Sequence, residues 1–497
     1  MASFWLIFSA LPLLLSLSVT PPPLLAAEIH LPSLGGDSSA SLLSPQQELL
    51  LGEAFMRSLR KQVSILEQPV INHYIQTLGQ TLVLQSETPT APFEFFVVED
   101  DSINAFAGPA GKIGIHSGLI MKAKSEGELA AVLAHEIAHV SQKHLMRALE
   151  NRQHLSIQAA ATVLATILAS SASPEAGEAV IATATGLSLQ KEINFTRSNE
   201  QEADRVGMQL LFHADYAPAN MPTFFKRLQQ STRHDGESLP EYLRTHPLTL
   251  SRIADAESRV RQYPAIPPHS DQEFQRIRSQ LLVDHYTNPE AAVRFYRSQL
   301  QRITDEDEGK IERGDLQYGL ALALLHADRA DEARQQLLPL LQQNPDQATL
   351  LITMAKAEAE SNRLADALQR IQQARDLYPV HLGLTLFHAE LLQQAQQWAR
   401  AIEVLLQGGE SYPTYPSLHR ALSTTYNLAQ HPAQSHLSLA HFHFLRGETP
   451  LAIRQLEYAE QAAQAAPNNF ILFATIDERR RLYEEKEQQE ESEGHLK

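Results

Sequence analysis

The sequence of 497 residues contains no cysteine. It therefore has no disulfide framework, no thiolate metal ligand, no cysteine nucleophile and no N-terminal cysteine to carry a lipid. Positive charge is also scarce, with 41 basic against 58 acidic residues and a formal net charge of −17. Such an acidic chain is a poor partner for nucleic acid, whose phosphates bind basic surfaces. Metal binding or catalysis must therefore come from histidine, carboxylate and hydroxyl side chains.

The N-terminus lacks lysine and arginine up to Arg57. It begins instead with an apolar run, Phe4 to Val19, followed by three prolines and then Leu24-Leu25-Ala26-Ala27-Glu28. An apolar core, a break and small residues before a polar start predict a signal peptide at residues 1–27, and the missing basic residues leave an uncleaved anchor as the alternative. No later stretch reaches the ~18 apolar residues that a membrane span needs. We therefore expect an exported protein, which in a Gram-negative-type cell lies in the periplasm.

Hydrophobic periodicity predicts a mostly helical chain with two short strands. The expected helices cover residues 45–60, 68–85, 126–149 and 198–212, and the expected strands cover 93–98 and 112–116. Two alanine-rich apolar segments, 155–169 and 175–189, are each too short to cross a membrane. We expect two core helices there, and a hairpin in peripheral contact with a membrane is the alternative.

Small residues and prolines recur every 34 residues beyond a proline- and charge-rich junction. The recurring sets, each 12 residues after the previous one, are Ala321, Ala355, Ala389; Ala333, Ala367, Ala401; and Pro345, Pro379, Pro413. Small residues let antiparallel helices approach closely, and the proline ends the second helix. This pattern resembles the tetratricopeptide repeat. Because Ala440 and Ala452 lie 51 residues beyond Ala389 and Ala401, we expect a fourth repeat after an irregular insertion.

The stretch Ala134-His135-Glu136-Ile137-Ala138-His139 carries the clearest chemical signal. Residues four apart lie on one face of a helix, so His135 and His139 can bind one metal ion through their imidazoles. Glu136 lies beside them, where a carboxylate can take a proton from metal-bound water. The flanking residues are apolar, which indicates a buried helix. We therefore predict a hydrolytic site with one Zn²⁺ per chain.

A catalytic zinc site needs a third protein ligand and an open fourth position. Glu200 and Asp204 lie downstream, four residues apart on one helical face. Glu200 can bind the metal, and Asp204 can accept a hydrogen bond from a ligand histidine and fix its tautomer. His144 follows His135 by nine residues, so we expect it on the opposite, surface side of the helix. We expect Glu202, on another helical face, to be solvated.

Four stretches together resemble one known family. They are Asn104-Ala105-Phe106 with the glycines up to Gly118, the helix of His135 to His139, the segment Glu200 to Asp204, and Arg244-Thr245-His246-Pro247 followed by Arg252. The chain resembles the zinc metallopeptidases that include HtpX and the CaaX prenyl-protein endopeptidases, and within them the periplasmic, repeat-bearing BepA group. The resemblance covers roughly residues 35–260, and the repeats extend it toward the C-terminus.

The resemblance implies roles for further residues. Glu200 becomes the third zinc ligand, Asp204 the partner behind it, and His246 and Arg252 lie near the site. His246 either stabilises the oxyanion of the reaction or binds zinc as a fourth ligand and displaces the water, which would make the enzyme latent. Arg252 offsets developing negative charge. The residues leave both roles of His246 open.

These observations predict a mainly α-helical protein with a small β-sheet, in which a zincin-type metalloprotease domain precedes an α-solenoid of tetratricopeptide repeats. The expected division is a signal peptide at 1–27, the protease domain at 28–262, linker helices at 263–312, the repeats at 313–482 and a frayed charged tail at 483–497.

We expect a zinc endopeptidase that degrades misfolded or stalled envelope proteins, with the repeats holding clients. By resemblance its partners are outer-membrane proteins and their assembly machinery. The alternatives are a chaperone or scaffold with a latent zinc site, and an oligopeptidase that trims short peptides. We also expect the glycine-flanked strand at 112–116 to pair with an extended substrate backbone.

Overall fold

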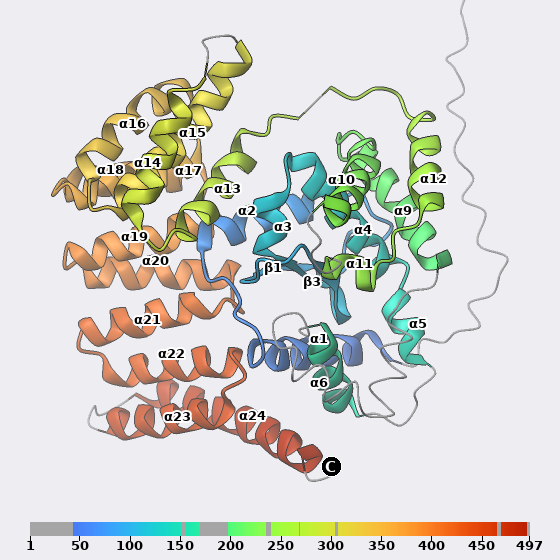
Figure 1. Cartoon of the computed structure of the whole chain (residues 1–497). Coiled ribbons are helices and arrows are strands. Elements are labelled where there is room, and N and C mark those ends of the chain that lie inside the picture. The colour runs from blue at the N-terminus through green and yellow to red at the C-terminus, as the bar shows by residue number, and fades with distance from the viewer. Residues whose placement is uncertain are drawn as a thin grey trace, which may run out of the picture. The chain divides into compact units, whose positions relative to one another are not determined.

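The computed structural model describes residues 43–150, 156–168, 197–234, 240–267, 269–303, 307–464 and 469–494 (Figure 1). The expected signal peptide at 1–27 and the expected helix at 175–189 lie outside these residues. Helices and one small sheet make up the described chain, as the sequence predicts. No helix within the described ranges combines the length and apolarity that crossing a membrane requires.

The N-terminal half of the described chain surrounds the histidine motif. Its elements are α1 (Pro45–Arg60), α2 (Pro69–Val83), β1 (Glu94–Val98), β2 (Ala105–Ala107), β3 (Lys112–His116), α3 (Ser117–Lys122), α4 (Glu126–Ser141), α5 (His144–Glu150), α6 (Ile157–Leu168), α9 (Arg197–His213), α10 (Asn220–His234), α11 (Glu241–Thr245) and α12 (Leu250–Val260). Helix α1 begins at a capping box, in which Ser44 and Gln47 each accept the other's backbone N–H. Helix α6 packs apolar residues against α1, which supports a core helix there.

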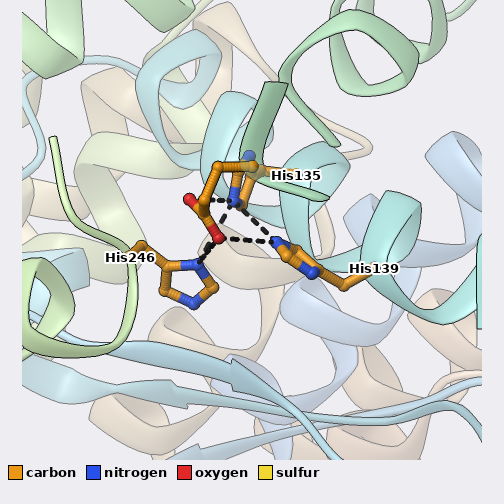
Figure 2. A group of neighbouring side chains, drawn as sticks. His135, His139 and His246 are labelled. Atoms are coloured by element: carbon orange, nitrogen blue, oxygen red, sulfur yellow. Dashed lines mark hydrogen bonds and ion pairs between the residues drawn. The ribbon is translucent and has the colours of Figure 1, made fainter. Parts of the chain in front are cut away.

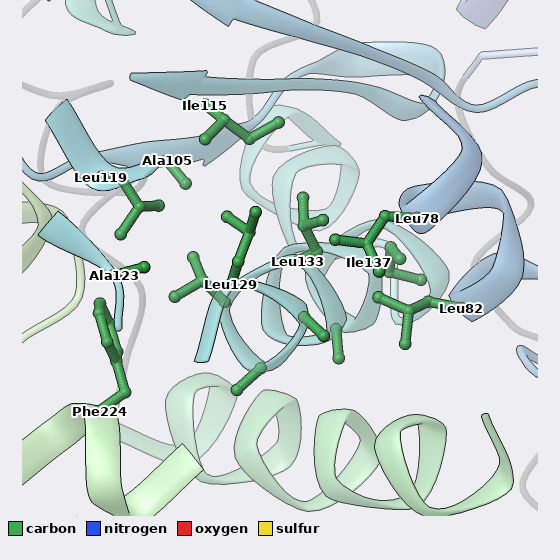
Figure 3. Close-up of a cluster of buried hydrophobic side chains, with 14 of the residues drawn as sticks. Leu78, Leu82, Ala105, Ile115, Leu119, Ala123, Leu129, Leu133, Ile137 and Phe224 are labelled. Atoms are coloured by element: carbon green, nitrogen blue, oxygen red, sulfur yellow. The ribbon is translucent and has the colours of Figure 1, made fainter. Parts of the chain in front are cut away.

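Helix α4 carries the histidine motif through the centre of the largest apolar core. Its N-cap Ser125 accepts the N–H of Glu128, and nearly every later side chain of the helix is buried. Along this helix Leu129 lies near Leu119 and Ala123, and Ile137 lies beside Leu78 and Leu82 of helix α2 (Figure 3). A helix buried on all sides is held rigidly, which suits the support of a reacting group.

The sheet has the strand order β1-β3-β2, with β1 parallel and β2 antiparallel to β3. The strand at 112–116 is therefore central, and both of its edges are already paired. Our expectation that this strand binds substrate backbone is therefore wrong. Its flanking glycines serve the local backbone instead: Gly111 has a φ of 71°, and a Cβ on Gly118 would collide with the Asp101 carbonyl oxygen. Among the described strands β2 pairs only with β3, and it contacts α4.

The C-terminal half consists of helices only. They are α13 (Gln272–Asp284), α14 (Pro289–Leu300), α15 (Asp307–His326), α16 (Ala330–Gln343), α17 (Ala348–Glu360), α18 (Leu364–Leu377), α19 (Leu382–Gln394), α20 (Trp398–Ser411), α21 (Pro416–Leu428), α22 (Pro432–Leu445), α23 (Thr449–Gln464) and α24 (Phe470–Gly494). Successive helices from α15 to α24 pack on one another as antiparallel neighbours, which is the α-solenoid that the 34-residue period predicts (Figure 1).

The repeat register continues where the sequence suggested an insertion. Helices α16, α18, α20 and α22 begin at residues 330, 364, 398 and 432, each 34 after the last. The fourth repeat therefore follows directly, and the expected insertion is wrong. Ser423 and Ser435 take the places of the two alanines, and the Ser435 hydroxyl donates to the Ser423 carbonyl at 2.9 Å. Gly447, with a φ of 78°, stands where the proline would be.

The C-terminal helix is longer than expected. Helix α24 runs to Gly494, and Tyr483 within it is buried. The Tyr483 ring stacks on Phe444 at a centroid distance of 4.0 Å, and its hydroxyl lies 2.9 Å from His441 Nδ1. A frayed tail beginning at residue 483 is therefore wrong, because aromatic packing anchors the helix there.

The repeat helices contact the protease half through α1 and α2. The Asn72 amide donates to the Tyr415 hydroxyl at 2.8 Å, and the Arg60 guanidinium donates to the Leu445 carbonyl at 2.7 Å. At the same interface the His73 and His381 rings lie against each other at a centroid distance of 3.8 Å, tilted by 33°. Burial lowers the pKa of His73 to about 4 and that of His381 to about 3.

Acidification should weaken the fold through this histidine pair. In the unfolded chain His381 binds a proton below its ordinary pKa of 6.5, whereas in the folded protein it stays neutral down to about pH 3. The free energy of unfolding therefore decreases as the pH falls below 6.5. His381→Asn removes the ionisable ring, while asparagine can still accept the Leu384 N–H that His381 Nδ1 accepts as helix N-cap. Between pH 5.5 and 4 we expect the free energy of unfolding to decrease less steeply in this variant than in wild type, by about 1 kcal/mol per pH unit. Chemical denaturation across this range measures the slope, and an unchanged slope would contradict the assignment.

Candidate metal centre

Four side chains from three parts of the chain converge beside α4. His135 and His139 come from α4, Glu200 from α9, and His246 from the segment that follows α11 (Figure 2). One potential ligand atom from each residue lies within 4.8 Å of all the others. All four side chains are almost completely buried. The structure thus brings together the two motif histidines, the expected third ligand Glu200, and His246, one of whose two expected roles is that of a fourth ligand.

The distances within the cluster suit a shared cation. His135 Nε2 and His139 Nε2 are 3.0 Å apart, and Glu200 Oε1 lies 3.4 Å from His139 Nε2. His246 Nδ1 lies 3.0 Å from Glu200 Oε1 and 3.4 Å from His135 Nε2. Nitrogen and carboxylate donors that face one another in a dry site are the donor set that zinc takes. The residues present therefore fit a metal of this class.

Glu136 lies next to the cluster with its carboxylate oxygens buried. Neither oxygen makes a hydrogen bond of normal geometry with a described residue, although the backbone N–H of Ala107 acts to lower the carboxyl pKa, and His246 Nε2 lies 3.5 Å from Glu136 Oε1. Burial raises the pKa of the Glu136 carboxyl. Burying a carboxylate costs free energy unless hydrogen-bond donors, such as those of a water molecule, satisfy its oxygens. Its position and raised proton affinity suit a general base.

Asp204 and Arg252 support the cluster from behind. Asp204 Oδ1 lies 3.0 Å from His135 Nδ1, and Arg252 donates two hydrogen bonds of 2.8 Å to the Asp204 carboxylate. Arg252 Nη1 also lies 2.6 Å from Glu200 Oε2. Arg252 is thus engaged by two carboxylates. This contact fits a role in holding both carboxylates charged, and its expected part in offsetting reaction charge stays a prediction.

These contacts set the protonation of the metal-free site. Burial acts to raise the pKa of Asp204 and Glu200, but neighbouring cationic groups and hydrogen bonds outweigh it and lower both. Burial acts to lower the pKa of His135, yet hydrogen bonds to Asp204 and Glu200 raise it to about 9. Burial lowers the pKa of His139 well below its ordinary value. Metal binding must therefore release the His135 proton.

His144 and Glu202 are placed differently from our expectations. His144 is 1% exposed and contacts His139, and its other ring nitrogen lies 3.0 Å from Glu202 Oε2. The expected single helix at 126–149 is wrong, because α4 ends at Ser141 and Lys143 adopts a φ of 55°. That break turns His144 back toward the motif. No residue in the sequence signals it, since lysine rarely takes positive φ.

Tyr242 is a further site residue that the sequence analysis missed. Its ring stacks on His246 at a centroid distance of 4.8 Å, and its hydroxyl is buried without a hydrogen-bond partner among the described residues. The Phe224 ring meets it edge-on at 6.2 Å. Tyr242 precedes His246 by four residues, which is the one signal that could have indicated a shared face.

Comparison with known proteins gives a consistent assignment. Residues 69–260 match peptidase family M48. The chain is 36% identical over 400 residues to the beta-barrel assembly-enhancing protease of Yersinia pestis, which covers 79% of this chain and 80% of that protein. It is 39% identical over 322 residues to a putative protein of the same name from Vibrio cholerae, covering 64% of each. It is 29% identical over 217 residues to the mitochondrial metalloendopeptidase OMA1 of Arabidopsis thaliana, covering 43% of this chain and 41% of that protein.

The match runs from α2 through α12 and so includes all three parts of the chain that supply the cluster. The family match, the relatives and the buried cluster of histidines and a carboxylate agree: the chain belongs to the M48 peptidases and is a metallopeptidase.

Proposed function

We propose that this protein is a zinc endopeptidase of the periplasm that cuts misfolded or stalled envelope proteins during outer-membrane protein assembly. The observation that carries the catalytic part is the buried cluster of His135, His139 and Glu200 with Glu136 beside it. The envelope role is supported by relatives named for beta-barrel assembly and by the expected signal peptide.

His135, His139 and Glu200 would hold one zinc ion. Zinc at such a site supplies Lewis acidity and lowers the pKa of water to about 7. Glu136 then accepts a proton from the attacking water and passes it to the leaving amine. Asp204 keeps the His135 proton on Nδ1, which leaves Nε2 free to act as a ligand. Arg252 keeps Asp204 and Glu200 ionised through its paired contacts.

His246 in this arrangement blocks the reaction. Its Nδ1 is part of the ligand cluster, and its Nε2 lies 3.5 Å from the Glu136 carboxylate. One ring thus fills both the fourth metal position and the space in which the base would meet a water. We propose that this arrangement is a latent form, and that His246 leaves the cluster before cleavage. This observation also favours the second candidate function, a chaperone or scaffold whose site is mostly silent.

Substrate binding should use the edge of β2 rather than β3. The outer edge of β2 is unpaired among the described strands, and β2 contacts α4. An extended peptide can add to such an edge through backbone hydrogen bonds. A client must therefore present an unfolded segment, and the repeat solenoid is the element suited to hold the rest of it.

Capture of clients tests the envelope role. We expect full-length Glu136→Gln, expressed in a Gram-negative cell, to retain outer-membrane proteins that wild type releases as fragments. Proteins that copurify with each form are identified after crosslinking, with exposed His213→Leu as the control. Equal recovery of intact clients by wild type and Glu136→Gln, without fragments, would favour the scaffold function. Recovery of short peptides alone would favour the oligopeptidase.

A further inference from the structure

The two motif histidines are supported from behind in different ways. His135 has the buried carboxylate of Asp204 at 3.0 Å from its Nδ1. His139 has another imidazole instead, since His144 Nδ1 lies 2.9 Å from His139 Nδ1. The His144 ring is buried, and its Nε2 lies 3.0 Å from Glu202 Oε2. A line of three side chains therefore connects the cluster to Glu202, whose side chain is 34% exposed.

These contacts allow one arrangement of protons when His139 binds metal. A metal on His139 Nε2 requires the ring proton on Nδ1. That proton points at His144 Nδ1, which must then be an acceptor. The His144 proton consequently lies on Nε2, where Glu202 accepts it. Each hydrogen bond fixes the tautomer of the next ring. Because the Glu202 carboxylate can only accept, every hydrogen bond in the line runs from His139 toward Glu202.

The backbone is built to make this contact. Helix α4 ends two residues after His139, Lys143 takes a φ of 55°, and α5 begins at His144. Had the helix continued, His144 would point to the opposite side of α4. Glu202 comes from α9, two residues beyond Glu200, so α9 serves the cluster on two of its faces.

We propose that His144 and Glu202 are positioning residues that hold His139 in the tautomer and orientation needed to bind the metal. The inference rests on the proposed ligation of metal by His139. Outer partners of this kind typically change metal affinity by 10- to 100-fold. Neither residue touches the metal position itself, so their loss should weaken binding without abolishing it.

Two substitutions at residue 144 separate positioning from packing. His144→Leu removes the acceptor for the His139 N–H. His144→Asn keeps an acceptor in the place of Nδ1, because the asparagine Oδ1 occupies the same branch of the side chain. Glu202→Leu removes the far end of the line. The exposed His213 on α9 provides a matched control, His213→Leu.

The test measures zinc affinity of the mature protein by competition with a chromogenic chelator, together with the absorption spectrum of the cobalt-loaded protein. We expect His144→Leu to bind zinc about 10- to 100-fold more weakly and to alter the cobalt spectrum. His144→Asn should recover most of the affinity, Glu202→Leu should lose about tenfold, and His213→Leu should match wild type. Thermal unfolding of each metal-free form shows whether it is folded.

Wild-type affinity in a folded His144→Leu, or equal weakness of folded His144→Leu and His144→Asn, would overturn the positioning role. If His144→Leu does not fold, the comparison of His144→Asn and Glu202→Leu with wild type decides in the same way. Failure of wild type to bind zinc would instead overturn the ligation by His139, and this inference with it.

Discussion

Replacing Glu136 with glutamine should lower kcat/KM for casein, and the rate of self-cleavage, by about 10²- to 10⁴-fold, the usual contribution of a general base. Glutamine has nearly the same shape but cannot take a proton, so binding of metal and client should persist. The proposed metal ligands His135 and His139 lie on the same helix as Glu136, and the substitution leaves both in place. Initial rates of peptide release, with zinc content measured on the same samples, give the effect.

Glu257→Gln is the matched control for this substitution. It converts an exposed carboxylate on α12, paired with Lys226 at the surface, into the same amide. We expect wild-type rates from it. A Glu136→Gln protein that cleaves casein at the wild-type rate with full zinc content would show that another group takes the proton.

Removing the His246 imidazole should raise activity on the order of tenfold or more if the latent form predominates at rest. In the structure its Nδ1 belongs to the ligand cluster while its Nε2 faces Glu136. His246→Ala therefore opens the fourth position and exposes the base together. Rates of casein cleavage and of self-cleavage measure the change, with zinc content as the first control and His213→Ala as the second.

The opposite result has a definite meaning. If His246→Ala keeps its zinc and cleaves tenfold more slowly than wild type, His246 stabilises the reacting oxyanion rather than blocking the site. The stacked ring of Tyr242 would then hold His246 ready for catalysis instead of in the ligand cluster.

The sequence predicts those parts of the site that depend on local geometry. His135 and His139 are four residues apart on one helix, as are Glu200 and Asp204, and helix periodicity alone brings each pair to one face. The contact between these two helices, α4 and α9, is part of the tertiary structure, and only the family resemblance indicated it. His144 could not be predicted, because it depends on one lysine that takes positive φ and ends α4 early.

The sheet and the repeats show the same limit. Strands β1 and β3 were predicted from their residues, but the three-residue strand β2 was not. The central place of β3 depends on pairing between segments that are distant in the chain. The fourth repeat was obscured because Ser423 and Ser435 serve as the small residues where alanine was sought. Serine there is acceptable because each hydroxyl has a partner inside the helix pair.

We propose that the buried cluster binds zinc through His135, His139 and Glu200. Elemental analysis of purified residues 28–497 tests it most directly, with His139→Ala, Glu200→Ala and Glu136→Gln prepared in parallel. We expect about one zinc per chain in wild type and in Glu136→Gln, and little or none in the two ligand variants. Wild type without zinc, or ligand variants that keep it in full, would contradict the assignment of the metal centre.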